Sequence, residues 1–388
     1  MLNIAFIVGK VGDPTYIQRK KIKVRAYKQS PQWLQKGIKP YTEFANGYGE
    51  HDNGIAGDIP TDVAIAAYIN HYYSKTCKVT LFDGCQLVEE KGGLQLCNQM
   101  DVIFVIYGAA EILDDRGREA MRRFIAILKK TEATVIPSNS YYDYINSKIK
   151  YYKDLTHAGL PVAQSAGFRI KNITTLPQAQ QFKDTILRKF GGKSVILKPG
   201  IGAYGVGLKI MKNVERTKQN SILKYFEKLQ KKGYTHIIAQ EFVRTFADNY
   251  EVRTYWVYDG RNKYKYAYSY ASRINSSPSG ISIDSFASEG GKMDDAILRN
   301  MKKLAQKALK ATKPIDPPTP WLRMDIGCCL DNGKLEENGL FFVNEIETIG
   351  ANLLVSKTKK DIIPLFSKAA YKIAKDYNKK RLHRTPMS

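Results

Sequence analysis

Short apolar segments alternate with helical ones along the first 137 residues, and this alternation restricts the fold more than any other feature of the sequence. A strand, a helix and a second strand connect naturally as a right-handed parallel unit. We therefore expect residues 1–137 to form a parallel α/β domain, with a long polar loop between the first strand and Pro60. The expected strands are 3–9, 78–82, 101–107 and 134–137, and the expected helices are 63–73 and 112–130.

Two further units are expected after this domain. A helix rich in Tyr and Lys over 141–160 precedes a smaller unit, so that the second unit covers 138–243. From residue 251 the chain becomes strand-rich, and the third unit covers 244–388, with a Ser- and Gly-rich loop over 272–291. The expected strands are 194–198, 208–211, 237–243, 252–258, 264–270, 321–330 and 340–346, and the expected helices are 221–232, 293–311 and 360–378.

The charge of the chain favours an acidic partner. Lys and Arg number 61 against 37 Asp and Glu, which gives a formal net charge of +24 over 388 residues. Lysines spread over solvated faces explain the same balance equally well. Five scattered cysteines without a Cys-x-x-Cys pair argue against a disulfide framework or a zinc site. With no secretory leader and no apolar run that could span a bilayer, we expect a cytoplasmic protein without a membrane partner.

A lysine at the end of a strand precedes a run of glycines. Lys198 is followed by Gly200, Gly202, Gly205 and Gly207, after which a second strand begins. Glycines allow backbone N–H groups to approach an anion closely, and the lysine can reach the same phosphates. The pattern predicts a phosphate-binding turn; a glycine-rich hairpin with a surface lysine is the alternative.

Three carboxylates and one arginine occur on two apolar strands that a turn joins. Because alternate residues of a strand share a face, Arg323 and Asp325 point one way, as do Glu345 and Glu347. Pairing of the two strands would place these four residues side by side. Clustered carboxylates repel one another unless a cation is bound, and ligands that are all oxygen favour Mg²⁺ or Mn²⁺ over zinc. The alternative is a solvated sheet face with a salt bridge to Arg323.

A third polar interruption lies in the apolar strand 237–243. Gln240 and Glu241 are followed by Phe242 and Val243, so the strand edge can offer backbone groups to an adenine and a carboxylate to a ribose. A buried strand without a ligand explains the same residues.

These segments, in this order, resemble the ATP-grasp superfamily, and most closely its branch containing the ribosomal S6–glutamate ligases and glutathione synthetases. The resemblance covers roughly residues 140 to 355. Five or six short matches in the family's order carry it. The matching segments are Lys148 before 155–161, Lys198 with the glycines after it, 240–243, 251–253, Arg273, 323–325 and 345–347.

The sequence also departs from the family pattern. Ser147 stands where an acidic residue usually precedes the first lysine, and Glu347 replaces the usual Asn, which adds a negative charge. Ile349 replaces the Pro of a common Pro-Gly pair. Phe286 stands where the close relatives have Asn, on the acceptor side, so the substrate of those relatives does not carry over.

The resemblance implies an ATP-grasp fold of α/β (α+β) class that follows an N-terminal parallel α/β pre-ATP-grasp domain. It implies an enzyme that uses ATP and two Mg²⁺ ions, with Mn²⁺ as a substitute, to join a small-molecule or peptide carboxylate to an amine through an acyl phosphate. ADP and phosphate are released. The implied nucleotide-binding residues are Lys148, Lys198, Gly202, Gly205, Gly207, Gln240, Glu241, Val243 and Glu251. The implied metal ligands are Asp325, Glu345 and Glu347, and the implied catalytic residues are Arg323, Arg253 and Arg273.

Three other functions remain open from the sequence. An ATP-grasp small-molecule kinase would use the same nucleotide and metal site but would stop at phosphoryl transfer to a hydroxyl. A protein-modifying ligase would act on an acidic polypeptide, which the +24 charge suits. A basic nucleic-acid-binding protein without catalysis is disfavoured, because no aromatic–basic platform is evident and the carboxylates would repel phosphates. The sequence does not reveal the acceptor or whether the protein forms a homo-oligomer.

Overall fold

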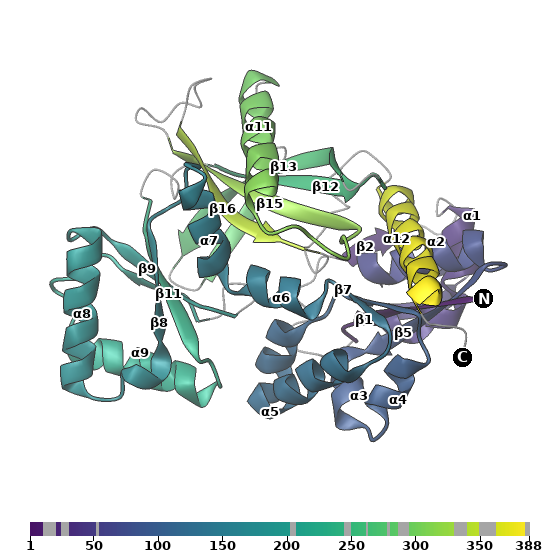
Figure 1. The fold of residues 1–388 in the computed structure, drawn as a ribbon, viewed down its shortest axis with the longest axis horizontal. Helices are drawn as coiled ribbons and strands as arrows, with labels where there is room; N and C mark the ends of the chain where they lie inside the picture. Colours follow the sequence, from purple (N-terminus) through teal and green to yellow (C-terminus); the bar gives the residue numbers. More distant parts are fainter. Residues whose placement is uncertain are drawn as a thin grey trace.

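The structure, a computed structural model of the chain, describes residues 1–10, 21–24, 31–51, 54–201, 207–243, 250–260, 263–277, 280–285, 295–329, 340–348 and 362–384. Within these residues the strands form four sheets, and helices pack against them (Figure 1). No helix among the described residues is both long and apolar enough to cross a membrane.

The N-terminal sheet is parallel throughout, as the alternation of strands and helices predicts. Its order is β5-β1-β6-β7, so the chain starts in the middle of the sheet and extends to both sides. The central strand β1 is almost entirely buried, which explains its continuous apolarity. The strands are β1 (Leu2–Val8), β5 (Cys77–Asp83), β6 (Val102–Val105) and β7 (Thr134–Ile136), and the helices are α2 (Thr61–Tyr73), α3 (Gly84–Glu89), α4 (Gly93–Asn98) and α5 (Ala109–Lys130).

The long polar loop expected before Pro60 is wrong for the described residues of this stretch. They form a three-stranded antiparallel sheet in the order β2-β4-β3, together with two short helices. Trp33 and Leu34 are buried in the N-terminal core, so a few apolar residues anchor a segment whose composition is otherwise polar. The elements are β2 (Lys21–Val24), α1 (Gln32–Gly37), η3 (Lys39–Phe44), β3 (Asn46–His51) and β4 (Gly54–Pro60).

The single helix expected over 141–160 is two helices. Ser147 has ψ of 65°, outside the helical range, and separates α6 (Asn139–Asn146) from α7 (Lys148–His157). Periodicity alone does not reveal this break, because both helices bury tyrosines on one core. The break makes Lys148 the first residue of α7.

A small antiparallel sheet follows, in the order β10-β9-β11-β8. Two amphipathic helices pack on it and bury Phe182 and Phe226 in a common core. The sequence analysis missed β8 and α8, although Thr175 and Gln178 form a capping box that starts α8. The elements are β8 (Ser165–Arg169), η4 (Ile170–Asn172), α8 (Leu176–Phe190), β9 (Val195–Pro199), β10 (Lys209–Met211), α9 (Gln219–Lys231) and β11 (His236–Glu241).

The last sheet has the order β14-β13-β12-β15-β16 and is antiparallel. The loop expected over 272–291 is wrong where the structure describes it, because 272–277 and 280–285 are paired strands; 286–291 lie outside the described residues. One face of the sheet is apolar and packs on α7 and α11. The elements are β12 (Tyr250–Tyr258), β13 (Tyr264–Ser277), β14 (Gly280–Ser285), α11 (Asp295–Ala311), β15 (Trp321–Cys329) and β16 (Leu340–Glu347).

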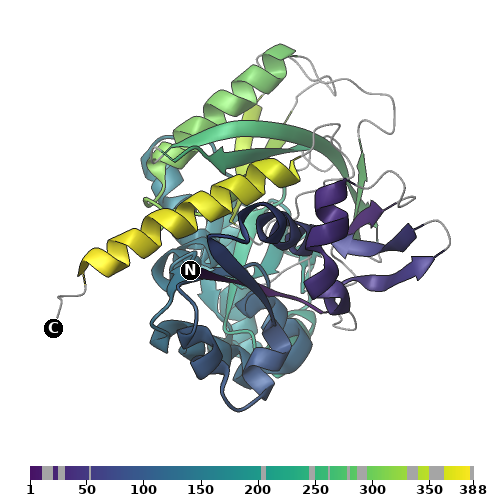
Figure 2. The ribbon, with the colours of Figure 1, turned by 90° about the vertical axis from the view of Figure 1, so that its right-hand side faces the viewer.

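Helix α12 (Ile363–Arg384) packs against both the N-terminal domain and the last sheet. Its apolar residues, among them Phe366 and Ile373, share one core with Ile4 of β1, Val63 of α2 and Trp321 of β15. Figure 2 shows this helix lying between α2 and the sheet of β12 and β13. The C-terminal helix therefore fixes the N-terminal domain against the last sheet. The unit boundaries at 137 and 243 remain a prediction.

Candidate functional site

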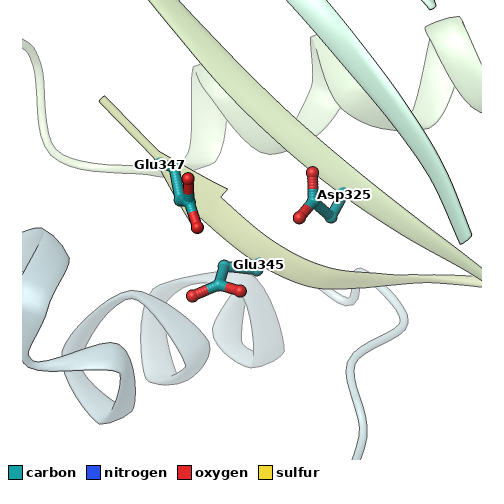
Figure 3. Close-up of side chains that lie close together, drawn as sticks. All are labelled: Asp325, Glu345 and Glu347. Atoms are coloured by element: carbon teal, nitrogen blue, oxygen red, sulfur yellow. The ribbon is translucent and has the colours of Figure 1, made fainter. Parts of the chain in front are cut away.

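The hairpin of β15 and β16 brings three carboxylates together. Arg323 pairs with Glu347 and Asp325 pairs with Glu345, as the alternation of the two strands predicts. One ligand oxygen from each of Asp325, Glu345 and Glu347 lies within 4.8 Å of the others (Figure 3). Asp325 is buried, and both glutamates are part-buried. The arrangement can receive one or more cations with oxygen ligands alone.

A β-bulge shapes this cluster. The register shifts so that Asp325 opposes Glu345 while Ile326 opposes Val343, which leaves Asn344 as an extra residue in β16. Because of the bulge, Val343 points into the apolar core, whereas Asn344 points to the opposite face. Its Nδ2 donates a hydrogen bond of 2.7 Å to Glu251 Oε2.

Arg323 holds two of the three carboxylates. Its Nε and Nη2 donate to the two oxygens of Asp325 at 2.7 and 2.8 Å, and Nη2 also lies 2.9 Å from Glu347 Oε1. Arg323 and Asp325 are buried, so this fork is strong and fixes the orientation of both carboxylates.

Arg253 and Glu251 form a neighbouring buried pair on β12. Arg253 Nε donates to Glu251 Oε1 at 2.9 Å, and since Asn344 binds the other oxygen, both oxygens of Glu251 accept hydrogen bonds within the protein. Arg253 pairs with Asp325 across the sheet. Arg273 pairs with Tyr250 and with Asp284 in the same sheet; its side chain lies outside the described part of the chain.

Two lysines reach this cluster from different units. Lys148 Nζ donates to Glu345; burial lowers the pKa of Lys148, but the Glu345 carboxylate outweighs it and the pKa is raised. Lys198 pairs with Ile238 across the small sheet. Burial and the nearby Lys148 ammonium lower the pKa of Lys198 to about 8, although Glu345 and Glu251 act in the opposite direction. No described residue forms a hydrogen bond or ion pair with Lys198 Nζ.

The carboxyl groups differ in their electrostatics. Burial raises the pKa of Asp325 and of Glu347, despite the attraction of Arg323. Burial acts in the same direction at Glu345, but Lys148 and Lys198 outweigh it and the pKa of Glu345 is lowered. A bound divalent cation would favour the ionised form of all three.

The end of strand β11 and the residues directly after it are the predicted adenine-binding residues. Gln240 is buried, and its Nε2 donates to Ser165 Oγ at 3.2 Å. Glu241 Oε1 accepts from Lys193 Nζ at 2.6 Å, while its backbone continues the sheet. The N–H of Val243 has no backbone acceptor among the described residues, and Val243 is part-exposed.

Of the glycines after Lys198, the structure describes Gly207, and both Gly202 and Gly205 lie outside the described residues. Gly207 has φ of +77°, and an added Cβ would lie 2.8 Å from Pro199 Cγ. Only glycine suits both the backbone conformation and the space at this position.

The sequence analysis missed Asn344, Tyr151 and Tyr152. Tyr152 Oη donates to the backbone oxygen of Asn344 at 2.6 Å, and the N–H of Ile346 donates to Tyr151 Oη over a long 3.5 Å. A signal existed for the tyrosines, because positions three and four after Lys148 share its side of a helix. For the bulge that selects Asn344 the signal was weaker: strict alternation would place the apolar Val343 on the same face as Glu345.

Comparisons with protein-family models and with curated proteins find no match to this chain. Solved structures do match it. The structure of D-cycloserine synthetase DcsG has a TM-score of 0.58 at 13% identity and covers 97% of this chain and 99% of its own. D-alanine–D-alanine ligase from Bacillus anthracis, complexed with ATP, has a TM-score of 0.53 at 12% identity and covers 99% and 100%.

A third match is N5-carboxyaminoimidazole synthase from Aspergillus clavatus with ADP and 5-aminoimidazole ribonucleotide, with a TM-score of 0.52 at 12% identity, covering 96% and 77%. All three proteins are ATP-grasp enzymes. This chain therefore has the ATP-grasp fold, of mixed α/β class with a parallel N-terminal sheet, as the sequence resemblance predicts. The S6–glutamate ligase and glutathione synthetase branch stays a prediction.

Proposed function

We propose that the protein is an ATP- and Mg²⁺-dependent carboxylate–amine ligase that forms an amide and releases ADP and phosphate. One observation supports the proposal: on an ATP-grasp fold, Lys148 contacts Glu345 of the carboxylate cluster, and Lys198 lies close enough for its charge to act on both residues. Ammonium groups beside a cation site are what a magnesium-bound triphosphate requires. The structural matches, which are ADP-forming ligases, support the same reaction class.

The donor set fits Mg²⁺. Asp325, Glu345 and Glu347 offer only oxygen, and their mutual separation of up to 4.8 Å allows more than one ion. Glu347 supplies a third negative charge, and its contact with Arg323 offsets part of it. Bound Mg²⁺ would supply charge neutralisation at the β- and γ-phosphates.

The protein's own groups have the following roles. Lys148 and Lys198 bind the α- and β-phosphates, and Val243 N–H donates to the adenine. Gln240 and Glu241 shape the adenine and ribose pocket, and Glu251 holds Arg253 in place. Arg323 neutralises charge on the transferring phosphoryl group, while Arg253 and Arg273 orient the acceptor carboxylate.

The reaction proceeds in two displacements. A carboxylate oxygen of the acceptor attacks the γ-phosphorus, the bond to the β-phosphate oxygen breaks, and ADP leaves. The amine nitrogen then attacks the acyl carbon, phosphate leaves, and the amine loses a proton to give the amide. Asp325, Arg323 and Arg253 are buried, which limits the access of water from their side of the site and helps to protect the acyl phosphate from hydrolysis. The acceptor is a small carboxylate or a peptide; the charge of +24 also suits an acidic polypeptide.

An ADP-release screen tests the proposal. Amino acids, dipeptides and polyols serve as acceptors, with Mg²⁺ and ATP, and hydroxylamine is added to trap an acyl phosphate as a hydroxamate. We expect ADP release that needs a carboxylate, hydroxamate formation, and loss of both in Lys198→Ala and Glu345→Ala. ADP release with a polyol and no hydroxamate would indicate a kinase. Unchanged turnover in both variants would contradict the site assignment.

A further inference from the structure

Helix α7 forms hydrogen bonds to the backbone of strand β16 on both sides of Glu345. The Tyr152 hydroxyl donates to the backbone oxygen of Asn344, and the Tyr151 hydroxyl accepts from the N–H of Ile346. Two hydrogen bonds from one helix therefore hold the backbone of β16 just before and just after Glu345.

The bulge explains why the hydrogen bond from Tyr152 to Asn344 can form. Asn344 has no partner in the β15–β16 ladder, so its backbone oxygen is free for Tyr152. The side chain of Asn344 is held from the opposite direction by Glu251. Without these contacts a bulged residue next to the cluster would have several conformations, and Glu345 would move with it.

The packing of the two tyrosines keeps their hydroxyls in place. Both tyrosine side chains are almost fully buried, and their ring centroids are 4.7 Å apart with the planes at 64°. The two rings thus form a rigid support for the backbone of the predicted metal strand.

We propose that Tyr152, with Tyr151, is a positioning residue that fixes Glu345 for metal binding through the bulged Asn344. This inference rests on the proposed function, because it assigns a support to the same metal site. Groups that orient metal ligands typically change metal affinity or activity by about 10- to 100-fold when they are removed. Neither tyrosine touches the phosphates or the acceptor in this assignment.

The test removes a single hydroxyl. In Tyr152→Phe the ring stays in the core, while the hydrogen-bond donor to the Asn344 backbone oxygen is lost. Mn²⁺ binding is measured by electron paramagnetic resonance at fixed ATP, and ATP affinity is measured separately in EDTA. We expect Mn²⁺ to bind about tenfold more weakly or worse, with metal-free ATP affinity changed less than twofold. Tyr151→Phe should shift Mn²⁺ binding in the same direction by a smaller factor.

Tyr144→Phe is the matched control. Tyr144 is buried on the neighbouring helix α6, but its hydroxyl bonds to Asp154 and to the N–H of Lys313, away from β16. Mn²⁺ binding should not change in this variant. Equal losses in the Tyr144 and Tyr152 variants, or an equal loss of metal-free ATP binding, would mean a general structural role and would overturn the proposal.

Measurements on the wild-type protein distinguish failure of the proposed function from failure of the positioning role. If wild type binds no Mn²⁺–ATP, the proposed function itself fails. If wild type binds it and Tyr152→Phe binds it equally well while folded by circular dichroism, the positioning role alone is refuted. Should Tyr152→Phe unfold, the folded Tyr151→Phe variant decides, because it removes the hydroxyl that accepts from the N–H of Ile346 on the other side of Glu345; unchanged Mn²⁺ affinity there also refutes the role.

Discussion

Raising the pH should weaken ATP binding through one lysine. Lys198 is the group concerned, because burial and the Lys148 ammonium lower its pKa to about 8 in the ligand-free protein. A triphosphate favours the ammonium form, so ATP selects the protonated fraction of the protein. Below pH 8 most molecules already carry this charge, and above pH 8 each must first take up a proton.

The size of the effect follows from the protonated fraction. With a pKa of about 8, roughly nine-tenths of the molecules have a charged Lys198 at pH 7 and about one-tenth at pH 9. Because apparent affinity scales with the competent fraction, the Kd for ATP should rise about tenfold from pH 7 to pH 9. Binding at pH 9 should take up about one proton.

Calorimetry in buffers of different ionisation enthalpy measures this proton directly, and competition with a fluorescent ATP analogue measures the Kd. Lys198→Arg provides the control, since a guanidinium stays charged over this range. That variant should show neither the proton uptake above pH 8 nor the tenfold loss. Uptake that persists in Lys198→Arg, or a wild-type Kd that is flat from pH 7 to pH 9, would refute the reasoning.

The free energy of unfolding of the ligand-free protein should increase with pH, whereas ATP binding weakens. In the unfolded chain the amine has its ordinary pKa near 10.4, so between about pH 8 and pH 10.4 the unfolded state binds more protons. The contribution of Lys198 to the free energy of unfolding of the ligand-free protein therefore increases with pH in this window. A comparison of urea unfolding of wild type and Lys198→Met from pH 8 to pH 10 isolates that contribution.

Three further predictions concern the same fold and site. Glu345→Gln should abolish Mg²⁺-dependent tightening of ATP binding, measured with and without EDTA; tightening that survives would exclude this carboxylate as a ligand. Arg323→Lys should lose the fork on Asp325, which costs about 2 kcal/mol in urea unfolding and at least tenfold in turnover; a wild-type stability would contradict the fork. Gly117→Ala should destabilise the protein by about 1–3 kcal/mol, because its φ of +82° and ψ of −178° suit only glycine, whereas Gly191→Ala, at φ of 58° and ψ of 39°, should cost about 1 kcal/mol. Thermal unfolding compares the two glycines, since an added Cβ meets no atom within 4 Å at either position.

Alternation along strands was enough to predict the centre of the site. Arg323 and Asp325, and likewise Glu345 and Glu347, needed only the two-residue period and a turn midway between the strands for their pairing to follow. The parallel N-terminal sheet followed in the same way from the order of strands and helices. These features depend on short-range patterns that tertiary contacts do not reverse.

Other features depend on contacts between distant segments and were missed for that reason. The stretch before Pro60 reads as a loop because its strands contain many glycines, yet Trp33 and Leu34 hold the segment in the N-terminal core. The break at Ser147 lies between two helices that share a core, so the apolar pattern continues across it. In both places long-range packing overrides local preference.

The bulge at Asn344 allows β16 to meet two requirements that a regular strand could not meet together. Before it, Val343 must face the core of α7 and α11; after it, Ile346 must face the same core while Glu345 and Glu347 face the cluster. Strict alternation would place Val343 on the same face as Glu345, with an apolar side chain against three carboxylates. The extra residue resolves this conflict, and its unpaired backbone oxygen then becomes the point at which Tyr152 supports the site. The packing of the core and the support of Glu345 thus have the same structural origin.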